Sequence, residues 1–184
     1  MSFKKAIFIA TSFVFLGSCN SNTGSSTDIS SDDLEIELPK SDVNFPSLSA
    51  DAMDKITSWQ YFQEFENDLK QINRGNVRSY RSETERMSAV SDSLLKNIPE
   101  ALNTNAISSR MRVVNVRVKL LEESIHQPNA ELEVITNHLK ETNNAFTNLI
   151  IQLNEKFEKM RIDELARTLE NLEQSESSRI SDSL

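Results

Sequence analysis

Residues that interrupt helices are scarce in this chain, and their scarcity constrains the fold more than any other feature of the sequence. Only three of the 184 residues are glycine and four are proline. Gly75 is the only glycine after residue 24. An all-β fold needs many tight turns, which glycine and proline commonly supply. We therefore expect an all-α protein.

Apolar residues recur at the helical period of 3.6 residues over four segments. The first segment is expected to begin near Ser49 and end at Gly75, the second covers 79–97, the third covers 106–125, and the fourth follows a turn at 126–129. The fourth contains a line of apolar residues with seven-residue spacing: Leu132, Leu139, Phe146, Leu153 and Met160. Such spacing is typical of a helix that packs at a small angle on its neighbours. The sequence predicts an antiparallel up-down four-helix bundle, with an elongated helical hairpin or coiled coil as the alternative.

The third segment allows two interpretations. Six of its apolar residues fall on one line of a helix: Ile107, Met111, Val114, Val118, Leu121 and Ile125. Residues 114–120 also alternate between apolar and polar, as a half-buried strand does. We favour the helix because more residues fit its period. Val113, Val116 and Leu120 then form a second apolar line, which indicates a helix covered on two sides or an oligomer contact.

The apolar pattern of the fourth segment changes direction after Arg161. Four later residues occupy a face rotated by roughly 90° or more from the line of Leu153; these residues are Ile162, Leu165, Leu169 and Leu172. Either the helix breaks near Arg161 or its last turns contact something else. Residues 175–184 are polar and serine-rich, and we expect them to form a disordered tail. The helical domain is therefore assigned to residues 49–174.

The beginning of the chain has the three-part layout of a secretory signal peptide. Lys4 and Lys5 precede an uncharged, mostly apolar run over residues 6–16. As a helix this run spans roughly 16 Å, about half of a bilayer's hydrocarbon core, so it is too short to cross a membrane. The segment that follows, Leu16-Gly17-Ser18-Cys19, resembles the lipobox of bacterial lipoproteins. This resemblance, which covers residues 1–19, implies that residues 1–18 are a removed signal peptide and that the thiol of Cys19 carries a lipid.

The resemblance also implies a location and a membrane partner. Acyl chains on Cys19 would anchor the chain in the cell envelope, because each buried methylene contributes about 0.8 kcal/mol. In the sorting rule of this family an aspartate after the cysteine retains the protein at the inner membrane, so Asn20 favours the outer membrane. The side of the membrane that the body faces stays open. Residues 19–48 are rich in serine and aspartate and are expected to form a disordered acidic tether.

Charge and motifs argue against several classes of function. The formal net charge of -8 repels phosphate groups, so we expect no nucleic-acid partner. A single cysteine, Cys19, allows no disulfide within the chain. Glu123 and His126 have the Glu-x-x-His spacing of di-iron bundles, but the sequence contains no second copy of this motif. We expect no metal site, no cofactor and no enzymatic activity.

By elimination the sequence predicts a module for protein–protein interaction or a structural role in the cell envelope. Its partner would be an unidentified envelope protein or a second copy of the chain. The candidate partner surface combines both unexplained apolar sets: Val113, Val116, Leu120, Ile162, Leu165, Leu169 and Leu172. Two alternatives stay open, a helical-bundle binding protein for a small apolar ligand and a holdase-like chaperone.

Overall fold

A computed structural model describes residues 37–75 and 79–181, and all regular structure in these residues is helical. The elements are α1 (Ala50–Ile56), α2 (Phe62–Arg74), α3 (Tyr80–Lys96), the 3-10 helix η1 (Glu100–Leu102), α4 (Asn105–His126) and α5 (Leu132–Ser181). The all-α prediction is confirmed. The ambiguity over residues 114–120 is resolved as helix, because they lie inside α4. The predicted signal peptide and the segment that resembles a lipobox, residues 1–19, lie outside the described residues.

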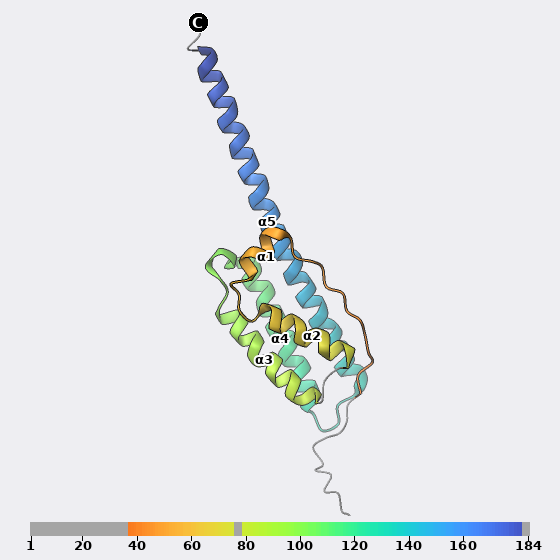
Figure 1. Ribbon diagram of the computed structural model, residues 1–184. Helices are drawn as coiled ribbons and strands as arrows, with labels where there is room; N and C mark the ends of the chain where they lie inside the picture. The colour runs from red at the N-terminus through yellow and green to blue at the C-terminus, as the bar shows by residue number, and fades with distance from the viewer. Residues whose placement is uncertain (1–36, 76–78, 182–184) are drawn as a thin grey trace, which may run out of the picture. The chain divides into compact units, whose positions relative to one another are not determined.

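From α2 onward each α-helix packs on the next one along the chain, whereas α1 contacts α5. Helix α2 contacts α3, α3 contacts α4, and α4 contacts α5 over most of its length (Figure 1). Phe146 of α5 occupies the centre of the core. The centroid of its ring lies 5.0 Å from that of Phe45, 5.3 Å from that of Phe62 and 5.2 Å from that of Phe65. This ring cluster joins α5 to α2 and to the segment that precedes α1.

The segment predicted as one helix from Ser49 to Gly75 forms two helices, so this prediction is only partly right. Both predicted ends are confirmed, because the Ser49 side chain caps α1 and Gly75 ends α2 with a φ of 69°. Residues 57–61 form a turn between them. The turn places Trp59 in the core, where its indole N–H donates to the carbonyl of Leu94 at 3.1 Å. Tertiary burial of Trp59 therefore overrides the local preference for a continuous helix.

The prediction of a disordered tether over residues 19–48 is wrong for its last part. Leu38 and Phe45 are buried in the core, with 5% and 6% of their surface exposed. The side chain of Asn154 in α5 holds the end of this segment, since it accepts from the Ser49 N–H at 2.8 Å and donates to the Ser47 carbonyl at 3.0 Å. The polar composition concealed these two apolar residues, whose burial offsets the cost of ordering the chain. Residues 19–36 lie outside the described residues.

Helix α5 neither breaks near Arg161 nor ends at residue 174 (Figure 1). It continues to Ser181, so the prediction of a disordered tail is wrong for residues 175–181. No glycine or proline interrupts this stretch. The hydroxyl of Ser175 donates to the Leu172 carbonyl at 2.8 Å, so this serine bonds within the helix instead of ending it.

Candidate interaction surface

Helix α5 leaves the core at Phe157, which is the last buried residue of the helix. Every side chain from residue 158 to residue 179 is exposed. Figure 1 shows this part of α5, in dark blue, extending beyond the ends of α1 and α4. We call residues 158–181 the distal segment. Its side chains that the structure describes are therefore available to a partner.

One face of the distal segment carries large apolar side chains. Ile162 and Leu165 are each 53% exposed, Leu169 is 60% exposed and Leu172 is 59% exposed. We call these four residues the apolar stripe. Their spacing of three, four and three residues is that of the a and d positions of a coiled-coil heptad. On the same helix, the core residues Phe146 and Leu153 have no exposed surface. The stripe is thus built like a packing face but lies outside the core.

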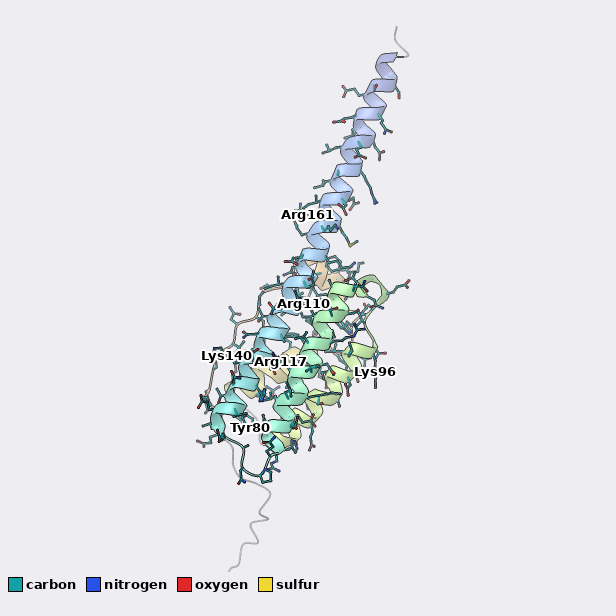
Figure 2. The ribbon with its side chains drawn as sticks, turned by 180° about the vertical axis from the view of Figure 1, so that it is seen from behind. Tyr80, Lys96, Arg110, Arg117, Lys140 and Arg161 are labelled. Carbon is teal, nitrogen blue, oxygen red and sulfur yellow. The ribbon has the colours of Figure 1, made fainter. Side chains whose placement is uncertain are left out.

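The rest of the distal segment is charged. Residues 158–179 contain six acidic and four basic side chains, and six minus four gives a net charge of -2. Arg161 donates to Glu158 at 2.7 Å within the helix (Figure 2 labels Arg161). Interspersed charges of both signs keep this surface hydrated, and they give it no net positive charge.

A hollow of about 920 Å³ lies between α1 and the start of the distal segment. Asp51, Asp54 and Lys55 of α1 line it together with Phe157, Met160 and four charged residues of α5. Arg167 is one of these four, and at 100° per residue it lies on the side of α5 opposite the apolar stripe. The hollow and the stripe are therefore separate surfaces.

The structure does not bring the two halves of the predicted partner surface together. Val113 and Val116 of α4 are 45% and 54% exposed, but they lie beside the part of α5 that packs in the core. Arg117, their neighbour, pairs with Glu141 of α5 at 3.5 Å. In Figure 2 it lies on the packed helices, away from the distal segment, and we call these packed helices the helical body. Leu120 is half-buried and lines a different hollow. The four residues of the stripe thus form a surface by themselves.

Both ends of the apolar line with seven-residue spacing lie outside the core, so the prediction that they pack there is wrong. Leu132 is 50% exposed and Met160 is 53% exposed, whereas Leu139, Phe146 and Leu153 are buried. Met160 instead lines the hollow beside α1. A signal of this change is present in the sequence, since the seven-residue spacing continues after Met160 with the polar residues Arg167 and Gln174.

The Glu-x-x-His pair makes contacts of another kind. One ring nitrogen of His126 lies 2.8 Å from a carboxylate oxygen of Glu85 on α3, and the other lies 2.8 Å from the Glu122 carbonyl. Among the described residues no group of three or more potential metal ligands comes together. His126 thus links the end of α4 to α3.

A cluster of charged side chains joins α2 to α3. Arg86 of α3 donates to Asp68 and Glu64 of α2 and to Glu83 of its own helix. Asp68 is only 3% exposed, and its Oδ2 makes no hydrogen bond within the described part of the chain. Burial raises the pKa of the Asp68 carboxyl, and the hydrogen bond from Arg86 acts in the opposite direction.

The raised pKa of Asp68 predicts a pH dependence of stability. The Asp68 carboxyl binds a proton more tightly in the folded chain than in the unfolded chain. Binding of this proton therefore stabilises the folded state. The stabilisation is complete below the ordinary pKa of 3.8 and is lost as the pH rises through the raised pKa. As the pH rises through the raised pKa, the free energy of unfolding of the unsubstituted protein should fall relative to that of an Asp68→Asn variant. Urea unfolding at a series of pH values measures the difference. A difference that stays constant with pH would contradict the prediction.

None of the described helices is long and apolar enough to span a membrane. No protein-family model matches the chain, and no curated protein or solved structure is detectably similar to it. The role of the distal segment therefore has to follow from the chemistry of its own residues.

Proposed function

We propose that this protein is a lipid-anchored component of the cell envelope that binds another protein through the distal segment of α5. Cys19 would carry the lipid, with the outer membrane as the favoured location. Helices α2 to α5 would form the predicted four-helix bundle, and residues 19–36 would link it to the anchor. The observation that carries the proposal is the apolar stripe, whose residues are each more than half exposed.

The stripe offers a favourable free energy of burial. Burying a leucine or isoleucine side chain completely contributes roughly 1.5–3 kcal/mol. Because just over half of each stripe residue is exposed, burying the four exposed portions would contribute roughly 3–6 kcal/mol. Association costs subtract from this gain, so the stripe alone suits a weak or transient contact.

The helical state of the distal segment also favours a partner. Helices in proteins gain most of their stability from packing an amphipathic face against other elements. The distal segment has such a face, but beyond Phe157 no described side chain is buried. A partner that covers Leu165 and Leu169 would supply the missing packing.

The charges indicate that this partner is a protein and not a lipid surface. Helices that lie on membranes usually carry many lysine and arginine side chains on their polar face. The distal segment has a net charge of -2 over residues 158–179, which anionic lipids repel. An apolar stripe flanked by mixed charges is instead the pattern of a helix that binds a groove or another helix.

The two hollows described above, both lined by residues that the structure describes, give less support to storage of a small apolar ligand. The larger, about 920 Å³, is lined mainly by charged side chains. The smaller, about 430 Å³, is lined mostly by polar residues near the turn between α4 and α5, including Glu123, Glu131 and His138. Sites for apolar ligands are lined mostly by hydrophobic and aromatic side chains.

Photo-crosslinking in intact cells tests the proposed interaction. A photoreactive phenylalanine analogue in place of Leu169, in the full chain, should form light-dependent adducts with protein. The same analogue in place of Gln174 is the matched control, because Gln174 lies roughly 140° from Leu169 around the helix. We expect adducts from position 169 and few from position 174. Equal yields at the two positions, or adducts with lipid alone, would contradict the proposed function.

A further inference from the structure

We infer that the distal segment pairs with the distal segment of a second copy of this chain, as a short antiparallel coiled coil. The inference rests on the proposed function, since it names the partner of the same surface. Three features support it: the spacing of the apolar stripe, the charges that flank the stripe, and the absence of other described elements on this face of α5.

The spacing of the stripe makes it complementary to itself. Ile162 and Leu169 occupy a positions of the heptad, and Leu165 and Leu172 occupy d positions. In an antiparallel pair each a residue meets a d residue of the other helix. Leu165 would then lie against the partner's Leu169, and Ile162 against the partner's Leu172. The two helices would be related by a two-fold axis, so each of these contacts occurs twice. The pair therefore has four layers, and every layer contains only leucine and isoleucine.

The flanking charges favour the antiparallel direction. Lys159, Ala166 and Glu173 occupy e positions, which face the e positions of the other helix in an antiparallel pair. Lys159 would lie beside the partner's Glu173 at both ends of the stripe. At the centre the small side chain of Ala166 would lie beside the partner's Ala166. In a parallel pair e positions face g positions, which places Glu173 beside the partner's Thr168 and gives no pair of opposite charges.

The surroundings of the stripe leave room for this arrangement. Toward the helical body the same face of α5 stays exposed at Ile151 and Glu155, so the end of a second helix can continue along it. Helix α1 lies on another side, where Met160 and Arg167 line the hollow. An antiparallel pair also places the two helical bodies at opposite ends, whereas a parallel pair would place them next to each other.

The residues that bound the stripe set its length. Glu158 occupies the d position before the stripe, and Glu176 occupies the a position after it. In the antiparallel pair Glu158 would approach the partner's Glu176, so packing should stop there. Arg161 pairs with Glu158 at 2.7 Å and reduces this repulsion. Four layers make a weak interface, one that confinement of both copies to a membrane would favour.

Disulfide trapping in cells tests the pairing and its direction in the full chain. Two differently tagged copies, one with Leu165→Cys and one with Leu169→Cys, are expressed together and oxidised. The antiparallel layers predict a link between the two different copies at least about tenfold more abundant than either self-link. A parallel pair would instead give self-links. The chain without these substitutions measures any background from Cys19.

A second pair of variants separates packing from charge. Adding Ile162→Glu and Leu172→Glu to both copies should lower the yield of the link at least about tenfold. Asn171→Glu and Gln174→Glu add the same charge on the opposite side of the helix and should leave the yield within about twofold. All four positions are exposed, so neither pair should change the far-ultraviolet circular dichroism.

Reversal of charge tests the predicted ion pairs. Lys159→Glu alone should weaken the link, and Glu173→Lys in addition should restore it. No link between copies, predominant self-links, or equal loss in both glutamate variants would overturn the inference. The proposed function would survive that result if the photoreactive group at position 169 still formed adducts with a different protein, so the two failures are distinguishable.

Discussion

Replacing Phe146 with alanine is expected to lower the free energy of unfolding by about 3–5 kcal/mol. The side chain has no exposed surface, and its ring packs on those of Phe45, Phe62 and Phe65. These three rings come from two separate segments of the chain, so the cavity removes contacts that hold both segments to α5. A domain of this size has about 5–15 kcal/mol of stability in total, so the loss is a large part of it.

Urea unfolding followed by circular dichroism measures this loss. Trp59 is the only tryptophan and is buried, so its emission gives a second, independent signal. Val116→Ala is the control, because Val116 is 54% exposed and its truncation should change stability by no more than about 0.5 kcal/mol. If both variants unfolded at the same urea concentration, the prediction that the ring cluster stabilises the fold would be wrong.

If Cys19 carries a lipid, as we propose, then replacing it with serine is expected to abolish lipid attachment completely. The thioether can form only on a thiol, and the chain contains one cysteine. The signal peptide should then stay uncut, so the variant should retain residues 1–18. Cells are grown with a labelled fatty acid, and the protein is isolated and weighed by mass spectrometry. We expect the label on the unsubstituted protein and no label on Cys19→Ser.

Ser18→Ala provides the matched control for this experiment, since it replaces one small residue of the lipobox with another and keeps the thiol. It should be labelled as the unsubstituted protein is. A labelled Cys19→Ser variant, or a mature unsubstituted protein that still begins at residue 1, would refute lipid anchoring. The apolar stripe would still support an interaction of the distal segment, but two copies would no longer be brought together by confinement to a membrane.

Several local features of the fold could be predicted because neighbouring residues determine them. Ser49 caps α1, and Gly75 adopts the left-handed conformation that ends α2. Both roles depend on a few adjacent backbone groups. The assignment of residues 114–120 to a helix was correct for a similar reason, since the periodicity of a long segment outweighs a short alternation.

Other features depend on residues far apart in the sequence and could not be predicted. The turn at residues 57–61 forms because Trp59 reaches the carbonyl of Leu94, which is 35 residues later. The segment before α1 is ordered because Leu38 and Phe45 find a core that other helices build. Both contacts are made with residues of other helices, so no pattern within either segment identifies them.

The sequence by itself determined the helical class, the capping residues and the presence of an apolar stripe rotated away from the core line. These properties follow from backbone preferences and from the period of the helix, which act over one or a few turns. Only the tertiary structure decided that the core ends at Phe157, that α5 continues to Ser181 and that the stripe lies apart from Val113 and Val116. These three features depend on which side chains are buried, and the burial of a side chain depends on which distant helices pack against it.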